Sequence, residues 1–248
     1  MPPQSSTAAI DAAAQSRPGV TTPAAAPAAM PRWQRQLPNA LTILRLVIAL
    51  GFFTLLSVWT YPARDLVVTP RHPVLPYLVA AALFGLAAVP DAIDGPLARR
   101  WKVVSRFGRV MDPFADKVLV VGAFVMLAGP QFGASLADDP YFQVSGVQSW
   151  MVVLILGREL LVTSIRAVLE SEGRDFSAAW SGKAKMVVQA TGIPLILVVL
   201  GFTEVGPNTF GRWAIDIVVW LTVAITIVSG IPYVAKGLTA FADSKPTG

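Results

Sequence analysis

Apolar residues in this chain gather into long runs with few charges, instead of alternating with polar positions. Each run is close to the ~20 residues that a helix needs to cross the hydrocarbon core of a bilayer. The pattern therefore predicts an all-α, polytopic membrane protein built as one bundle of six transmembrane helices. We expect these helices at about residues 41–59, 73–90, 110–128, 150–169, 186–202 and 213–235.

The segments outside these runs differ in composition. Residues 1–30 are rich in Ala, Pro, Ser and Thr, and we expect them to form a disordered tail. They lack the basic start and apolar run of a signal peptide. Residues 31–38 mix Trp, Leu and Arg, which favours a juxtamembrane amphipathic segment at the membrane surface. The predicted domains are thus the tail, a membrane domain at 31–240 and a short C-terminal tail at 241–248.

Composition supports a membrane protein and restricts its chemistry. Of 248 residues, 54% are hydrophobic and only 14% are charged, whereas soluble domains carry about a quarter charged residues. The mean hydropathy is +0.59. There is no cysteine, and His72 is the single histidine, which argues against thiol catalysis, thiolate metal sites and histidine-based zinc sites. Any metal must rest on oxygen ligands, which favours magnesium, manganese or calcium.

Basic residues are distributed unevenly between the predicted loops, and the net charge is +5. With the N-terminus in the cytoplasm, the outer loops hold only Arg64, Arg71 and Arg212, and the positive-inside rule places both termini in the cytoplasm. We expect the basic charge to face anionic lipid, and we expect no nucleic-acid binding. The inner side then carries Arg32, Arg35, Arg99, Arg100, Lys102, Arg106, Arg109, Arg174, Lys183, Lys185, Lys236 and Lys245.

Four carboxylates stand at the ends of two neighbouring predicted helices. Asp91 and Asp94 are three residues apart, and Asp112 and Asp116 are four apart, so each pair shares one helix face. Acidic groups at membrane depth are costly and usually functional. A bound cation, or two, would balance them and could stabilise both oxygens of a phosphoryl displacement. The alternative is structural: these acids could cap a helix or pair with nearby basic residues, namely Arg99, Arg100, Arg109 and Lys117.

Small residues accompany the carboxylates. Gly95 follows Asp91 by four residues, Ala98 follows Asp94 by four, and Gly108 precedes Asp112 by four. They leave the acidic faces open to a bulky ligand. Arg99 adds a planar guanidinium suited to phosphate, and Gly95–Pro96 suggests a kink.

Together these residues resemble the signature of the CDP-alcohol phosphotransferase family. Eight positions match over 26 residues: Asp91-x-x-Asp94-Gly95-x-x-Ala98-Arg99, eight residues, Gly108, three residues, Asp112, three residues, Asp116. Further stretches are similar to the bacterial phosphatidylglycerophosphate synthases of that family, so the likeness covers about residues 36–235. These stretches are residues 37–45, 112–117, 157–160 with Arg166, and 181–185.

The resemblance implies an enzyme of the bacterial inner membrane, acting as a homodimer with its active site open to the cytoplasm. CDP-diacylglycerol would donate a phosphatidyl group to glycerol 3-phosphate, giving phosphatidylglycerophosphate and CMP. A divalent centre of magnesium or manganese, with two ions, would be held by Asp91, Asp94, Asp112 and Asp116, and Asp116 would also act as the base toward the acceptor hydroxyl. Gly95, Ala98, Arg99 and Gly108 would bind CDP. Pro90 and Pro96 depart from the family pattern without removing a functional group.

The acceptor site is expected from basic residues near the inner surface. Arg158 and Arg166 are eight apart, which puts them on one helix face about 12 Å apart, and Lys183 and Lys185 begin the next helix. Such a cluster suits the phosphate of an acceptor. Alternatively, Arg158 pairs with Glu159 or Asp216, and the lysines only contact lipid headgroups.

Two other functions stay open. A sister enzyme of the family would use inositol phosphate, serine or phosphatidylglycerol as acceptor. A divalent-cation transporter would also place carboxylates inside a membrane, although it would need polar groups along a whole crossing.

Overall fold

The computed structural model describes residues 32–59, 74–101, 106–134, 136, 139, 141–171 and 180–243. For 32–36, 38, 90–101, 106–107, 109, 180–184 and 240–243 it describes the backbone alone. The chain divides into two units, Met1–Arg32 and Trp33–Gly248. The predicted tail at 1–30 and residues 244–248 lie outside the described residues.

Six long helices make up the described part of the second unit, in agreement with the all-α prediction. They are α2 (Arg32–Val58), α3 (Val74–Trp101), α4 (Arg106–Leu127), α5 (Ser149–Ser171), α6 (Trp180–Phe202) and α7 (Phe210–Asp243). α2 includes the backbone of the predicted amphipathic segment, and α7 continues beyond residue 240, where we expected the membrane domain to end.

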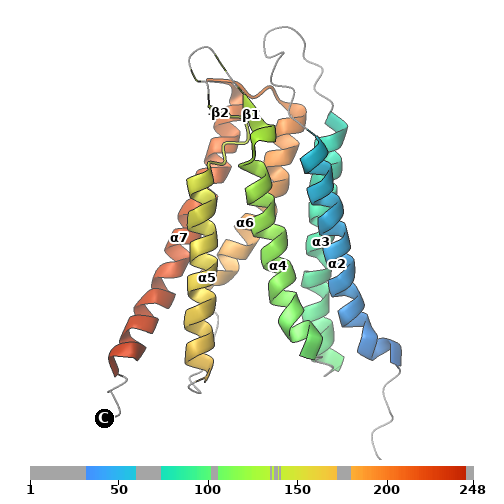
Figure 1. The fold of residues 1–248 in the computed structure, drawn as a ribbon, viewed down its shortest axis with the longest axis vertical. Coiled ribbons are helices and arrows are strands. Elements are labelled where there is room, and N and C mark those ends of the chain that lie inside the picture. The colour runs from blue at the N-terminus through green and yellow to red at the C-terminus, as the bar shows by residue number, and fades with distance from the viewer. Residues whose placement is uncertain are drawn as a thin grey trace, which may run out of the picture. The chain divides into compact units, whose positions relative to one another are not determined.

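The helices alternate in direction (Figure 1). The lower end of Figure 1 is the end at which α2, α4 and α6 begin and α3, α5 and α7 finish. The other end carries a 3-10 turn, Pro130–Phe132, and a two-stranded antiparallel hairpin of β1 (Gly133–Ala134) and β2 (Phe142–Gln143). This hairpin was not predicted. Its strands are two residues long, too short to give a periodic signal in the sequence.

Helix α6 lies against both α3 and α7, and α5 also packs on α7. Small side chains permit these contacts: Ala80, Ala81 and Ala87 of α3 are buried in the core. Aromatic rings fill the space toward α2, where Phe52 meets Phe84 edge-on at 5.7 Å between ring centroids. The six helices therefore enclose a main apolar core, and Ile165 and Leu169 of α5 form a second, smaller apolar cluster.

Three helices are long and apolar enough to cross a membrane, over Asn39–Val58, Lys185–Phe202 and Phe210–Thr239. α3 contributes a shorter apolar stretch, Val74–Val89. α4 and α5 do not qualify, because charged residues interrupt both helices. The model therefore supports a helical membrane protein with three candidate spans, and crossing by all six helices stays a prediction.

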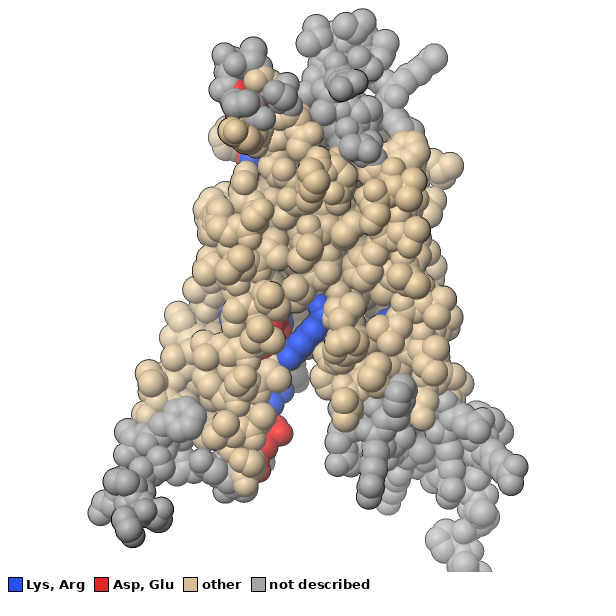
Figure 2. All heavy atoms as spheres, in the orientation of Figure 1, with Lys and Arg blue, Asp and Glu red and all other residues tan. Residues whose placement is uncertain are grey.

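The surface is more apolar than that of a soluble protein, and some polar side chains are buried inside the bundle. Large apolar side chains such as Leu50, Val187 and Ile217 are exposed, while Gln189 and Thr226 are buried and bonded to each other at 3.1 Å. Figure 2 shows one face whose upper part, below the loops, is almost free of charge. Blue and red atoms gather lower down on this face. A groove between α4 and α5 is lined by Lys117 and Glu159 among apolar residues. The apolar surface is the one expected to face lipid.

Candidate functional site

Asp112 and Asp116 lie one turn apart on α4, as their spacing predicted. Both carboxylates are partly buried, and they have different surroundings. The hydroxyl of Thr42 on α2 donates a hydrogen bond to Oδ1 of Asp112 at 2.5 Å. Thr42 is itself buried, so this bond fixes Asp112 from inside the bundle.

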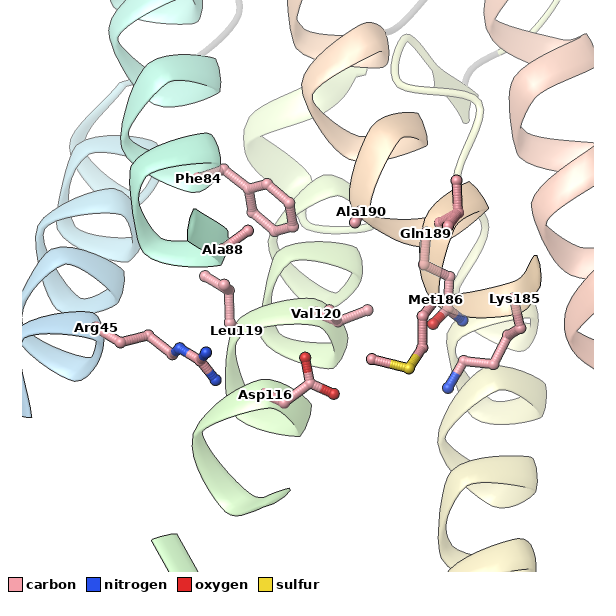
Figure 3. A pocket seen from close by; sticks show the side chains of 11 residues that line it. Arg45, Phe84, Ala88, Asp116, Leu119, Val120, Lys185, Met186, Gln189 and Ala190 are labelled. Atoms are coloured by element: carbon pink, nitrogen blue, oxygen red, sulfur yellow. The ribbon is translucent and has the colours of Figure 1, made fainter. Parts of the chain in front are cut away.

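Asp116 faces a cavity of about 280 Å³ between α2, α3, α4 and α6. Arg45 and Lys185 also line the cavity, with Gln189 above them and apolar side chains such as Phe84 and Leu119 closing the wall. Figure 3 shows the Asp116 carboxylate between the guanidinium of Arg45 and the ammonium of Lys185. An acid and two bases from three helices thus converge on one enclosed space, which suits an anionic ligand and its counter-ions.

Lys117, which follows Asp116 in the sequence, makes no ion pair with Asp112 or Asp116. Lys117 instead donates a hydrogen bond to the hydroxyl of Thr163 on α5. Among the described side chains, Asp116 makes no ion pair and no hydrogen bond. The described residues therefore do not show the alternative in which Lys117 pairs with these acids. The side chain of Arg109, the other partner considered, is not described.

The other half of the predicted acidic site lies on α3, which packs against α4. Positions 91 and 94 fall within one continuous helix, so they lie on one face, and the helix also continues through the expected kink at Gly95–Pro96. The side chains of Asp91, Asp94, Gly95, Ala98 and Arg99 lie outside the described ones. Gly108 is buried near the start of α4.

The donor set present fits a hard cation. Asp112 and Asp116 offer carboxylate oxygens on one face, and Thr42 orients one of them, as an outer hydrogen-bond partner does in metal sites. No cluster of three or more acidic or histidine side chains occurs among those that the structure describes. The other predicted ligands, Asp91 and Asp94, belong to α3, and their side chains are not described.

A second polar cluster surrounds Glu159, a buried residue of α5. Its carboxylate accepts hydrogen bonds from the ammonium of Lys185 on α6 and from Arg158 at 3.2 Å. Arg158 also donates to the hydroxyl and the carbonyl of Ser229 on α7, at 3.1 and 3.3 Å. The guanidinium groups of Arg158 and Arg166 each lie 5.8 Å from the ring centroid of Tyr233 on α7.

Three of the four predicted acceptor residues, Arg158, Arg166 and Lys185, therefore lie in one region. The side chain of the fourth, Lys183, is not described. Of the two partners considered for Arg158, Glu159 is the one found, since Asp216 pairs with Arg212 at 2.8 Å. One acid facing three bases leaves a net positive charge, and the Nε of Arg166 is buried without a hydrogen-bond partner among described residues. Both features suit a phosphate.

Sequence reasoning missed Thr42, Gln189, Tyr233 and the contact of Glu159 with Lys185, although it named Glu159 as a possible partner of Arg158. A second basic partner could have been expected, because an acid in the middle of an apolar run needs basic neighbours. The other three are ordinary residues of apolar helices, and only their tertiary contacts distinguish them.

Comparisons with known proteins identify relatives over most of the chain. The model of the CDP-alcohol phosphatidyltransferase family matches residues 35–228, which is most of the chain. The CDP-diacylglycerol--glycerol-3-phosphate 3-phosphatidyltransferase of Bacillus subtilis (strain 168) is 31% identical over 209 residues, covering 84% of this chain and 98% of the relative.

A protein of Mycobacterium tuberculosis (strain H37Rv), named probable phosphatidylglycerophosphate synthase, is 34% identical over 211 residues, covering 85% of this chain and 86% of the relative. The Cereibacter sphaeroides CDP-diacylglycerol--glycerol-3-phosphate 3-phosphatidyltransferase is 27% identical over 243 residues, covering 84% of this chain and 98% of the relative. The matched region contains the signature aspartates, the residues that line the Asp116 cavity, and Glu159 with Arg158, Arg166 and Lys185, and this chain belongs to the CDP-alcohol phosphatidyltransferase family.

Proposed function

We propose that this protein transfers a phosphatidyl group from CDP-diacylglycerol to glycerol 3-phosphate, forming phosphatidylglycerophosphate and CMP. The observation that carries the proposal is the Asp116 carboxylate, which faces an enclosed cavity between Arg45 and Lys185. Relatives that align over most of the chain bear the name of this activity.

Asp112 and Asp116, together with Asp91 and Asp94, would hold one or two divalent ions, magnesium or manganese. When bound, such ions neutralise charge on the pyrophosphate of the donor. The hydrogen bond from Thr42 to Asp112 supports this assignment, because it fixes the direction of one of the two carboxylates of α4.

The donor nucleotide would lie against the α3–α4 face that carries Gly95, Ala98, Arg99 and Gly108. Gly108 and Ala98 add little bulk, so the nucleotide can approach the helix backbone, and Arg99 can contact phosphate oxygens. The lipid part of CDP-diacylglycerol then extends toward the apolar surface of the bundle.

The acceptor would bind beside the donor through its phosphate, held by Arg158, Arg166, Lys183 and Lys185. Arg158 and Arg166 are held against one aromatic ring on α7, so their separation is set before the acceptor arrives. Such a cluster favours a phosphorylated acceptor over serine.

In the reaction, the acceptor hydroxyl oxygen bonds to the lipid-side phosphorus as the bond from that phosphorus to the CMP oxygen breaks. Asp116 accepts a hydrogen bond from the attacking hydroxyl and takes or relays its proton. Positioning contributes most of its effect, because a carboxylate beside a cation is a weak base. Arg99 and Arg45 balance the charge that appears on the departing CMP.

The protein would work as a homodimer in the bacterial inner membrane, with all six helices crossing, both termini cytoplasmic and the site open to the cytoplasm. α2 begins and α7 ends at the lower end of the bundle (Figure 1), and Asp116 lies in the half of α4 nearer that end. Both positions support this topology.

The direct test is product identification with purified protein in mixed micelles containing CDP-diacylglycerol. We expect CMP and phosphatidylglycerophosphate to form with glycerol 3-phosphate, and chelation by EDTA to stop both. Parallel reactions receive inositol phosphate, serine or phosphatidylglycerol. A faster reaction with one of these reassigns the acceptor, whereas absence of CMP with every acceptor contradicts the transferase function.

A further inference from the structure

Glu159 is a buried acid in a helix otherwise rich in apolar residues, and the proposed reaction gives it no role. Its carboxylate bonds both Lys185 on α6 and Arg158 on its own helix. Arg158 continues the connection to Ser229 on α7. Glu159 therefore fixes the direction of two bases at the point where α5, α6 and α7 meet.

Lys185 has a second acid within its surroundings. It lines the same cavity as Asp116, and Figure 3 shows its ammonium on the side of the cavity that faces the Asp116 carboxylate. Within the described part of the chain, no ion pair joins Lys185 to Asp116, and Lys185 bonds Glu159 instead. The ammonium is thus held by one of two acids that could reach it.

Because Lys185 is buried, it matters which of the two acids its ammonium bonds. Lys185 is 7% exposed, and a buried ammonium without an acid partner is strongly unfavourable. Its four-carbon stem is flexible, so the ammonium can move to another carboxylate when the first is lost. The remaining described acid beside the cavity is Asp116.

We infer that Glu159 is a positioning residue that holds Lys185 away from Asp116 and so keeps the Asp116 carboxylate available for its ligands. This inference rests on the proposed function, in which Asp116 acts on the acceptor hydroxyl and binds a cation. Lys185 in turn remains directed toward the acceptor phosphate. Without the charge at position 159, Lys185 pairs with Asp116 and blocks it.

The test is a double-mutant cycle of Glu159→Gln and Lys185→Met, assayed by CMP release. We expect Glu159→Gln to lower kcat by about 10²-fold, the scale of losing a catalytic acid or base. Lys185→Met should mainly raise KM for glycerol 3-phosphate. The double variant should recover the kcat of Lys185→Met, because no ammonium remains to occupy Asp116.

A purely structural role of Glu159 predicts the reverse, since the double variant would then be at least as impaired in kcat as Glu159→Gln. Glu170→Gln is the matched control: it makes the same chemical change on α5 at an exposed position and should leave kcat and KM unchanged. If Glu159→Gln does not accumulate as folded protein, Glu159→Asp keeps the charge on a shorter side chain. Its smaller loss of kcat should again be suppressed by Lys185→Met.

A second readout requires no substrate. Manganese binding to the purified variants, followed by electron paramagnetic resonance, should weaken about 10-fold in Glu159→Gln and return in the double variant. Manganese binding in Glu159→Gln equal to that of the unchanged protein overturns the inference. If the unchanged protein releases no CMP with any acceptor, the proposed function fails, and the manganese titration still decides whether Glu159 protects Asp116.

Discussion

At the scale of single residues, the two carboxylates of α4 differ in their contacts. Asp112 receives a hydrogen bond from buried Thr42, whereas Asp116 faces the cavity without a bonded partner among the described side chains. A carboxylate fixed by the protein suits a permanent ligand. One that faces open space suits a group that must meet the substrate.

Replacing Asp116 by Asn keeps the size of the side chain and removes its charge. We expect CMP release to fall by at least ~100-fold, because an amide neither accepts the acceptor proton nor binds a cation as a carboxylate does. The bundle should stay folded, which thermal unfolding and size-exclusion chromatography of the purified variant would check. Turnover like that of the unchanged protein would refute the role of Asp116.

Thr42→Val tests the other carboxylate, because valine matches threonine in shape and lacks the hydroxyl. Loss of the 2.5 Å bond leaves Asp112 free to rotate. We expect the magnesium concentration for half-maximal activity to rise about 10–100-fold, the usual effect of removing an outer partner of a metal ligand. Thr42→Ser retains the donor and should remain close to the unchanged protein. Equal magnesium dependence in the valine and serine variants would show that the Thr42 hydroxyl does not affect metal binding.

The sequence predicts only those features of the site that follow from the local geometry of a helix. The shared face of Asp112 and Asp116 follows from helical spacing alone. The partner of Asp112 is 70 positions away and that of Glu159 is 26 away, and no spacing rule says which face of α5 meets α6. The pairing of Arg158 could be narrowed to Glu159 or Asp216, and packing of the helices decides between them.

At the scale of helices, α6 and α7 approach closely at Gly192. A Cβ added there would lie 3.2 Å from the hydroxyl oxygen of Thr222 and 3.4 Å from a methyl of Val218. Small residues at such crossings let membrane helices pack backbone to backbone, since lipid supplies no hydrophobic force between them. This contact is near the middle of both helices, above Gln189 and Thr226, which join the same two helices.

We therefore expect Gly192→Leu to force α6 and α7 apart and to destabilise the protein by about 1–3 kcal/mol, as overpacking does. Gly51→Leu is the matched control, because a Cβ at Gly51 on α2 meets nothing within 4 Å. Thermal unfolding in detergent should show a lower Tm for Gly192→Leu alone. A Tm lowered equally in both variants would point to helix composition and not to the α6–α7 contact.

At the scale of the whole bundle, the six helices were predictable because long apolar runs are a strong signal. Crossing by all six helices stays a prediction, since α4 and α5 carry charged residues, among them those of the proposed site, and so lack the composition of ordinary spans. Asp116 and Arg166 belong to the halves of α4 and α5 nearer the lower end, and Glu159 lies at the middle of α5. The apolar halves lie toward the hairpin, which makes the bundle polar at one end, as an enzyme that meets soluble substrates on one side requires.

This asymmetry gives a prediction of orientation that the composition makes easy to test, because the chain has no cysteine and every introduced thiol is unique. Tyr141, 88% exposed, lies beside the hairpin, and Ser171 is the exposed last residue of α5 at the lower end. In intact cells, a membrane-impermeant maleimide should label Tyr141→Cys and should reach Ser171→Cys only after permeabilisation. Both variants should still release CMP, which verifies that they are folded. The opposite labelling pattern would place the Asp116 cavity on the outer side of the membrane, away from cytoplasmic nucleotides, and would contradict the proposed topology.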